Sequence, residues 1–573
     1  MLYNIGVVFI SNRRIKMNYL DKYNSWCNSD GLDAADKADL LSIANDDKEI
    51  QERFLYDLEF GTGGLRGVIG IGTNRINKYI VRKTTQGFAN YIKSFGAEAC
   101  KRGVVIAHDN RRFSISFCLE TAGVLAANGI QAYIFDSLRP TPELSFAVRE
   151  LSAFGGVVIT ASHNPPEYNG YKLYDERGCQ LVGESNDRVV DEVNKITNAL
   201  SVKALSKDEA GDLIKVLDSS MDETYYNKVM SISVTPDVKK NIKIVYSPQH
   251  GTGNVPVREV LSRLGYNVIP VIEQCDPDTE FSNTKNPNPE TAEAYSLAFD
   301  YAKKYDADII ITTDPDCDRL GVAVKKGNEY VRMTGNQSAA VLIKYILSRR
   351  QENGTLPKNG VMFNTIVTSD LGDRVCAEYG VKTEKTLTGF KFIGNKIYNH
   401  ELLGDAEFVF GYEESYGCLI ADFVRDKDAV QASLMLCEAA AYYHEQSKSL
   451  LDVLEEIYAK HGFYLDALDN FVFKGVDGPE KISQLVNGLR TNPPKNAGDV
   501  EVLEMEDYKS EKMLSLGFPS SNVLRFILAD GSWVAVRPSG TEPKCKFYFS
   551  VRAKDLAEAE CKLKVMKETF ERT

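Results

Sequence analysis

Residues 154–172 read FGGVVITASHNPPEYNGYK, an apolar β-branched run followed by a loop rich in proline and glycine. The run is short, which favours a strand buried in an α/β sheet. The loop after it offers a hydroxyl, an imidazole and an ammonium group from Ser162, His163 and Lys172. Ligand crevices of α/β sheets lie outside the carboxyl ends of the strands, so we expect Ser162 to face such a crevice, where a serine can carry a phosphoryl group.

Outward from this loop, apolar strands alternate with amphipathic helices, and this βα rhythm starts three times. The predicted strands of the three units are 103–107, 131–135 and 154–159; 242–246, 266–269 and 307–311; and 360–364 and 408–410. The predicted helices are 114–128 and 141–151; 257–264 and 290–304; and 339–348. The chain is therefore predicted to contain three consecutive α/β units.

The C-terminal part has a different pattern. Residues 523–528, 533–536 and 547–551 read as antiparallel strands with an Asp530-Gly531 turn, and 555–570 as a closing helix. This predicts a smaller α+β domain, joined to the rest through residues 492–496. At about 150 residues per domain, 573 residues also suggest about four domains. We place them at 17–215, 216–332, 333–465 and 466–573.

Composition narrows the class of protein. The chain has 43% apolar and 26% charged residues, and it contains no apolar run near the roughly 20 residues that a membrane span requires. The formal charge of −12 argues against nucleic-acid binding, so any anionic ligand must meet local basic groups. The 11 cysteines are odd in number and scattered, which favours a reducing cytoplasm over a disulfide framework.

The first residues are apolar, but their positive charges at Arg13, Arg14 and Lys16 follow the apolar part. A signal peptide carries its charges before that part. Because Met17 begins a more polar, helix-like stretch, we interpret residues 1–16 as an upstream start-site extension that the fold does not use.

A second candidate site is TDPDCDR at residues 313–319, directly after the predicted buried strand at 307–311. Asp314, Asp316 and Asp318 would repel one another unless a cation lay among them, and hard oxygen ligands select Mg²⁺ or Ca²⁺. The loop is not an EF-hand, because Arg319 stands where the glycine is required and Lys325 where the glutamate is required. The alternative interpretation is a solvated acidic turn.

Three further segments carry candidate groups. GYEESYG at 411–417 offers Glu413 and Ser415 for sugar hydroxyls, and RPSGTEPK at 537–544 offers a guanidinium, two hydroxyls and glycine amides for a phosphate. For the second of these, an ordinary polar turn is the alternative. The glycine-rich loop around Arg66 lacks the Lys-Ser/Thr ending of a P-loop, so it predicts no nucleotide site.

For His163, in the serine loop, a hydrogen bond to backbone is the alternative to a phosphate contact.

With these motifs in their order along the chain, the sequence resembles the α-D-phosphohexomutase superfamily, and most closely its bacterial-type phosphoglucomutase branch, which includes phosphopentomutase-like members. The resemblance runs from about residue 20 to the C-terminus. It implies three α/β domains with mixed sheets and a smaller C-terminal domain around a central active-site cleft. Tyr412 and Cys317 are small departures from the commonest motifs, and Tyr412 leaves the preferred sugar open.

The resemblance also implies roles for individual residues. Ser162 would be the phosphorylated serine, and it would bind the metal together with Asp314, Asp316 and Asp318. Arg66, Lys172 and His163 would act at the reacting phosphate. The residues implied for substrate binding are Arg319, Thr388, Gly389, Glu413, Ser415, Lys427, Arg537, Ser539, Gly540 and Thr541.

The implied reaction is the reversible conversion of α-D-glucose 1-phosphate to glucose 6-phosphate through a phosphoserine enzyme. Mg²⁺ and glucose 1,6-bisphosphate, as activator and intermediate, are the implied cofactors. The expected partners are sugar phosphates alone, without nucleic acid or membrane, and the expected state is a monomer or homodimer. Alternatives are a phosphopentomutase, a phosphomannomutase, a hexose-bisphosphate synthase, a metal-dependent phosphatase and a regulatory protein that binds sugar phosphates without turnover.

Overall fold

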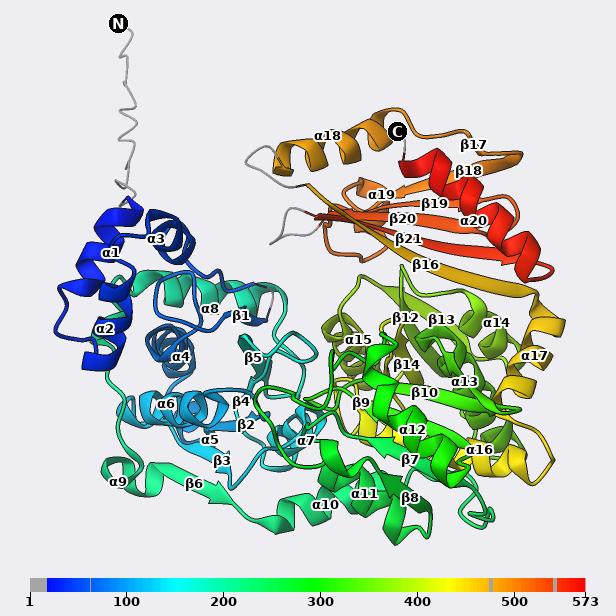
Figure 1. The fold of residues 1–573 in the computed structure, drawn as a ribbon, viewed down its shortest axis with the longest axis horizontal. Coiled ribbons are helices and arrows are strands. Elements are labelled where there is room, and N and C mark those ends of the chain that lie inside the picture. Colours follow the sequence, from blue (N-terminus) through cyan, green and yellow to red (C-terminus); the bar gives the residue numbers. More distant parts are fainter. Residues whose placement is uncertain (1–17, 62, 474–477, 539–543, 572–573) are drawn as a thin grey trace, which may run out of the picture.

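The computed structural model describes residues 18–61, 63–473, 478–538 and 544–571. The proposed extension at residues 1–16 lies outside them. Four β-sheets follow one another along the chain and give four domains, as predicted (Figure 1). Across the described residues, no helix combines the length and apolarity that crossing a membrane requires.

The first domain has a six-stranded mixed sheet in the order β1-β5-β4-β2-β3-β6. Its strands are β1 (Gly64–Val68), β2 (Val104–His108), β3 (Ala132–Phe135), β4 (Gly155–Ile159), β5 (Tyr168–Asp175) and β6 (Ile214–Leu217). Its helices are α1 (Tyr19–Cys27), α2 (Ala34–Ser42), α3 (Asp47–Phe54), α4 (Lys78–Lys93), α5 (Ala97–Arg102), α6 (Ser114–Ala127), α7 (Thr141–Glu150), α8 (Gly183–Lys195) and α9 (Lys207–Ala210). Strand β4 is buried along its length, which is why its sequence is continuously apolar.

The second domain has a five-stranded sheet in the order β11-β10-β9-β7-β8. Its strands are β7 (Lys243–Ser247), β8 (Asn267–Pro270), β9 (Ile309–Thr313), β10 (Leu320–Lys326) and β11 (Glu329–Met333). Its helices are α10 (Ser219–Met230), α11 (Asn254–Arg263) and α12 (Ser296–Tyr305). The predicted helix 290–304 begins later than expected, because an Asx turn, in which the Glu290 amide donates to Asn288 Oδ1 at 3.1 Å, keeps residues 288–291 in a loop.

The third domain has a four-stranded sheet in the order β13-β12-β14-β15. Its strands are β12 (Gly360–Thr365), β13 (Lys382–Thr386), β14 (Glu407–Glu413) and β15 (Gly417–Leu419). Its helices are α13 (Gly335–Glu352), α14 (Leu371–Glu378), α15 (Phe390–Leu403), α16 (Ala429–His444) and α17 (Leu450–His461).

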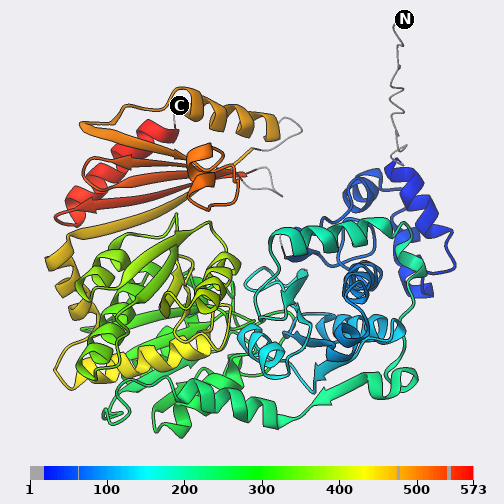
Figure 2. The ribbon, with the colours of Figure 1, turned by 180° about the vertical axis from the view of Figure 1, so that it is seen from behind.

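The fourth domain has a six-stranded antiparallel sheet in the order β16-β21-β20-β19-β18-β17. Its strands are β16 (Phe463–Val472), β17 (Asn496–Ala497), β18 (Val500–Asp507), β19 (Leu524–Leu528), β20 (Trp533–Pro538) and β21 (Lys544–Ala553). Its helices are α18 (Gly478–Thr491), α19 (Glu511–Ser515) and α20 (Leu556–Glu571). The sheet with α18 and α20 stands above the third domain in Figures 1 and 2.

The sheet pairings shift two of the predicted domain boundaries. Strand β16 pairs with β21 along its whole length, so the chain enters the fourth domain at Phe463, and the predicted linker at residues 492–496 lies inside that domain, between α18 and β17. Strand β6 pairs with β3, so the predicted boundary at 215/216 falls within a strand of the first domain. Strand pairing depends on residues distant in the sequence, which local composition does not reveal.

The buried cores divide the molecule unevenly. One continuous apolar cluster includes side chains from the first three domains, such as Phe146, Val257 and Leu434. The fourth domain has its own core, which includes Phe526 and Phe547. A smaller cluster of nine buried residues joins the third and fourth domains. The first three domains therefore form one packed body, to which the fourth is attached by a limited apolar contact, made of this cluster and of Tyr464 at the start of β16, which packs in the continuous cluster.

Candidate active site

The predicted nucleophile lies in the loop that leaves β4 at the carboxyl end of the strand, as the sequence indicated. Ser162 is buried, and its φ of 51° puts a non-glycine residue in the left-handed region. Such a conformation costs about 1–2 kcal/mol and is concentrated at functional sites. The Thr160 hydroxyl accepts the Ser162 amide at 2.8 Å, and Ser162 Oγ donates to Asp314 Oδ2 at 2.7 Å.

Arg111 fixes the shape of this loop. Its buried guanidinium donates to the carbonyl oxygens of Ser162, Pro165 and Tyr168 at 2.6, 2.7 and 3.0 Å. The Asp109 carboxylate lies 3.3 Å from Arg111 Nε and accepts the Arg111 amide at 2.9 Å. Because both terminal nitrogens of the guanidinium donate to backbone carbonyl oxygens, Arg111 holds the serine loop in place.

The three aspartates after β9 converge, as predicted. Asp314, Asp316 and Asp318 are buried, and their ligand atoms lie within 4.8 Å of one another. Asp316 Oδ1 and Asp318 Oδ1 are buried and have no hydrogen-bond partner among the described residues. Buried carboxylate oxygens left without a partner are what a metal ion would satisfy, and three hard oxygen donors suit Mg²⁺. The aspartate cluster can therefore hold a metal ion.

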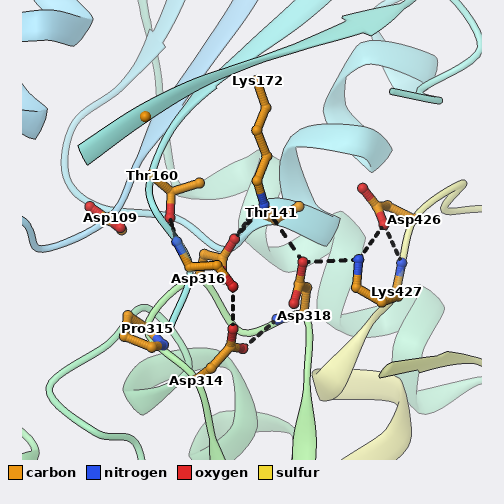
Figure 3. Close-up of polar contacts among 12 residues, drawn as sticks. Asp109, Thr141, Thr160, Lys172, Asp314, Pro315, Asp316, Asp318, Asp426 and Lys427 are labelled. Carbon is orange, nitrogen blue, oxygen red and sulfur yellow. Dashed lines mark hydrogen bonds and ion pairs between the residues drawn. The ribbon is translucent and has the colours of Figure 1, made fainter. Parts of the chain in front are cut away.

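The first domain contacts the aspartate cluster through the start of α7. The Thr141 amide and hydroxyl, at the start of α7, both donate to Asp316, to its carbonyl oxygen and its Oδ2, at 3.0 Å each. Figure 3 shows Lys172 reaching Asp316 and Asp318 from above and Lys427 to the right of Asp318. The aspartate loop of the second domain is thus held by Thr141 of the first domain.

Two lysines neutralise part of the acidic charge. Lys172 Nζ lies 2.8 Å from Asp316 Oδ2 and 3.7 Å from Asp318 Oδ2. Lys427 Nζ, from the third domain, lies 3.1 Å from Asp318 Oδ2 (Figure 3). Burial opposes their charge, but these aspartates keep the pKa of both lysines above its usual value. Both side chains are therefore cations at neutral pH.

Tyr174 extends this charge network to a further buried residue. Its hydroxyl donates to Asp426 Oδ2 at 2.7 Å, and Asp426 Oδ1 lies 3.1 Å from Lys427 Nζ. Tyr174 belongs to β5 of the first domain and Asp426 to the third, so the hydrogen bond crosses between domains. A lone tyrosine has no chemical signature in the sequence, and neither does Thr141.

Burial and charge shift the pKa values of the residues around Ser162. Burial first, and then the charges of Asp316 and Asp318, raise the pKa of Asp314 well above its usual value. Burial and then the nearby Arg319 lower the pKa of His163 well below its usual value. His163 is therefore a neutral imidazole, and its Nδ1 lies 3.2 Å from Ser162 Oγ. The exposed Arg66 reaches this loop from β1, where its Nη1 donates to Asn164 Oδ1 at 2.9 Å.

The predicted sugar-binding groups form a second cluster in the third domain. Glu413, at the end of β14, accepts the Gly389 amide at 2.8 Å, which brings the segment containing Thr388 and Gly389 beside it. Glu414 accepts from the Thr368 hydroxyl at 3.2 Å, and burial, followed by the charge of Glu413, raises the pKa of Glu414 to about 7. Ser415 is half-buried in the turn between β14 and β15.

Of the predicted phosphate-binding segment, Arg537 is the second-last residue of β20, whereas Ser539, Gly540 and Thr541 lie outside the described residues. Burial and then the charge of Arg537 lower the pKa of Lys391 to about 8. Burial also lowers the pKa of Lys546 on β21, with added effects of Lys544 and Arg537. Cations from the third and fourth domains therefore gather near Arg537, as an anion site requires.

Four family profiles match the chain in sequence order. They are the phosphoglucomutase/phosphomannomutase alpha/beta/alpha domain I at residues 57–200, domain II at 223–327, domain III at 334–461, and the C-terminal domain at 485–567.

Full-length relatives agree with these profiles. A phosphoglucomutase from Staphylococcus epidermidis is 36% identical over 542 residues, which span 92% of this chain and 96% of the relative. One from Staphylococcus aureus is 36% identical over 531 residues, which span 91% and 94%.

Solved structures agree on the fold. The open form of pp63/parafusin, a phosphoglucomutase from Paramecium, covers 90% of this chain and 95% of its own at 19% identity, with a TM-score of 0.68. A phosphoglucomutase/phosphomannomutase family protein from Burkholderia thailandensis covers 90% and 96% at 20% identity, with a TM-score of 0.66.

Proposed function

Since this chain belongs to the phosphoglucomutase/phosphomannomutase family, we propose that it interconverts α-D-glucose 1-phosphate and glucose 6-phosphate through a phosphorylated Ser162 and a glucose 1,6-bisphosphate intermediate. One observation carries the proposal: the Ser162 hydroxyl is hydrogen-bonded, at 2.7 Å, to Asp314 of the aspartate cluster. A phosphoryl group on that oxygen would lie directly beside the metal ligands and the two lysines.

The metal is proposed to be Mg²⁺, held by Asp314, Asp316 and Asp318 together with phosphorylated Ser162. When bound, it would offset negative charge on the transferring phosphoryl group. The unpartnered oxygens of Asp316 and Asp318 fit this requirement. Lys172 and Lys427 pair with the same two carboxylates, so their positive charges stand at the edge of the cluster, where a phosphoryl group would enter.

The transfer breaks the bond between Ser162 Oγ and phosphorus and forms one between phosphorus and the free sugar hydroxyl. That hydroxyl loses its proton, and Ser162 Oγ gains one. Neutral His163, 3.2 Å from Oγ, can exchange a proton with the serine, whereas Lys172 is protonated and stabilises charge instead. The bisphosphate then turns around and returns its other phosphoryl group to Ser162.

Substrate binding is proposed to use the second cluster and the cations near Arg537. Glu413 and Ser415 would accept or donate hydrogen bonds to sugar hydroxyls, with Thr388 and Gly389 beside them. Arg537, with Ser539, Gly540 and Thr541, would hold the phosphate that is not reacting. Such a cradle recognises a phosphate alone, which suits a substrate that binds in two orientations.

We further propose that the enzyme works in the cytoplasm, as a monomer or homodimer. All eleven cysteines are free thiols, which fits a reducing compartment.

Relative kcat/KM for glucose 1-phosphate, mannose 1-phosphate and ribose 1-phosphate, measured with Mg²⁺ and trace hexose bisphosphate, tests the function. Glucose is expected to give the highest value. A preference for ribose or mannose would reassign the substrate, and release of free phosphate at the turnover rate would indicate a phosphatase instead.

The Lys391 pKa of about 8 predicts a pH-dependent KM. Lys391 is cationic below pH 8 and becomes neutral above it, so attraction for the substrate phosphate is present at pH 7 and lost by pH 9. We expect KM for glucose 1-phosphate to rise several-fold over that range, while kcat changes less. The substrate does not cause this rise, because a phosphate monoester with a second pKa of about 6 is already a dianion.

The control is Lys391→Arg, whose guanidinium stays charged throughout. Its KM is expected to be flat between pH 7 and pH 9. An equal rise in the wild type and in Lys391→Arg would remove Lys391 from the phosphate site.

A further inference from the structure

The loop before α12 presents one carboxylate to the active site that no motif assigns. Glu290 Oε1 accepts from Arg319 Nη1 at 2.6 Å. The other carboxylate beside that guanidinium is Asp318, at 3.8 Å from Nε, a longer contact. We propose that Glu290 is a positioning residue that holds the Arg319 guanidinium beside the phosphoryl group on Ser162. This inference rests on the proposed mutase reaction and adds a residue to it.

The backbone of Glu290 is fixed on both sides, so its carboxylate is presented in one place. Its amide donates to Asn288 Oδ1 at 3.1 Å, and its carbonyl oxygen accepts from Arg332 Nη1 at 3.0 Å. Pro289 precedes it and restricts φ. A side chain on a fixed loop loses less conformational entropy when it pairs with an arginine than one on a mobile loop does. The Glu290 carboxylate can therefore hold the Arg319 guanidinium in one orientation.

Arg319 is connected to the nucleophile through a single carboxylate. Its backbone amide donates to Asp314 Oδ1 at 3.0 Å, and Asp314 Oδ2 accepts from Ser162 Oγ at 2.7 Å. This connection fixes the Arg319 backbone relative to Ser162, but it leaves the long side chain to be oriented by other contacts. Glu290 supplies the shortest of these.

The guanidinium still has a donor to offer. Arg319 Nε is buried and has no hydrogen-bond partner among the residues that the structure describes. A buried charged donor left unpaired costs about 1–3 kcal/mol or more, so an acceptor is expected in the working enzyme. An anionic phosphoryl oxygen on Ser162 would supply the negatively charged acceptor that the Arg319 Nε–H group is missing.

The charges around Arg319 explain why a carboxylate is needed. Arg66 and Lys427 lie close enough to repel its guanidinium, and Glu413 lies close enough to attract it. Without Glu290, the guanidinium would be left to Asp318, Asp314 and Glu413, which the proposed function assigns to the metal and to sugar hydroxyls. Removal of the Glu290 carboxylate should therefore slow phosphoryl transfer only by displacing Arg319. It should have no further effect once Arg319 itself is absent.

A double-mutant cycle tests this directly. Glu290→Ala is expected to lower kcat/KM about tenfold to a hundredfold, mostly in kcat. Added to Arg319→Ala, it is expected to change kcat/KM by less than about twofold, because the group it positions is already gone. The rate at which glucose 1-phosphate removes the phosphoryl group from Ser162 in a single turnover should fall by the same factor as kcat.

Two variants control the comparison. Glu290→Gln keeps an acceptor oxygen without the charge, so an intermediate loss is expected, and it replaces Glu290→Ala should that variant fail to fold. Glu293→Ala removes an exposed carboxylate three residues further along and should behave as wild type. Independent, multiplying losses in the double mutant, or no loss in Glu290→Ala, would overturn the inference. A wild-type protein without mutase turnover would instead contradict the proposed function itself.

Discussion

Ser162→Ala is expected to lose mutase turnover by at least about four orders of magnitude, because the oxygen proposed to carry the phosphoryl group is removed. The structure predicts that folding is little affected. Ser162 Oγ contributes its hydrogen bond to Asp314 and its contact with His163, both within the reaction site. The backbone of the loop stays held by Arg111, which donates to the Ser162 carbonyl oxygen and not to its side chain.

The measurement pairs steady-state rates with mass spectrometry of the intact chain. Wild type incubated with glucose 1,6-bisphosphate should carry one phosphoryl group, and Ser162→Ala none. Ser433→Ala is the matched control, because this serine is also buried but lies in α16 and has no part in the site. Near wild-type rates of Ser162→Ala in saturating bisphosphate would show that the reaction does not pass through this residue.

Removal of divalent metal is the second large effect. Chelation is expected to reduce turnover by about three orders of magnitude, since a bound cation contributes several kcal/mol of charge stabilisation, and added Mg²⁺ should restore it. Asp318→Asn should raise the Mg²⁺ concentration that gives half-maximal activity by about tenfold or more, because one anionic ligand becomes neutral.

A binding readout separates metal affinity from catalysis. A ligand that binds only the folded state raises its stability by mass action, so Mg²⁺ should raise the Tm of the wild type and raise that of Asp318→Asn much less at the same concentration. Asp308→Asn, an aspartate before β9 that accepts the Lys243 amide, serves as the control. Full activity of the chelated wild type would contradict a metal-dependent mechanism.

The sequence predicted most of the elements that carry the site, because those elements are strongly patterned. Strand β4 and the serine loop, strand β9 and the aspartate loop, and the hairpin strands β19 and β20 all lie within one or two residues of their predicted places. Each combines an apolar run with turn residues or charged residues at its end, which is a local signal.

What local signals did not reveal depends on contacts between domains. Lys172 and Asp316 lie 144 residues apart, and Tyr174 and Asp426 lie 252 apart. The family resemblance placed Lys172 at the phosphate, but it did not reveal that two carboxylates of another domain fix the charge of this lysine. The sequence pattern predicted that Glu290 begins a helix. In the structure the turn at Asn288 keeps Glu290 in a loop, where its side chain reaches Arg319.

The limited apolar contact between the third and fourth domains has a consequence for how the reaction intermediate is used. A pivot of the fourth domain would disturb the nine residues of that contact and Tyr464 of β16, which packs in the shared core, but it would leave the core of the fourth domain closed. In the proposed mechanism, such a swing would let the bisphosphate turn or escape. The ratio of those two rates decides how many sugars are converted before an escaped bisphosphate must be recaptured to recharge Ser162.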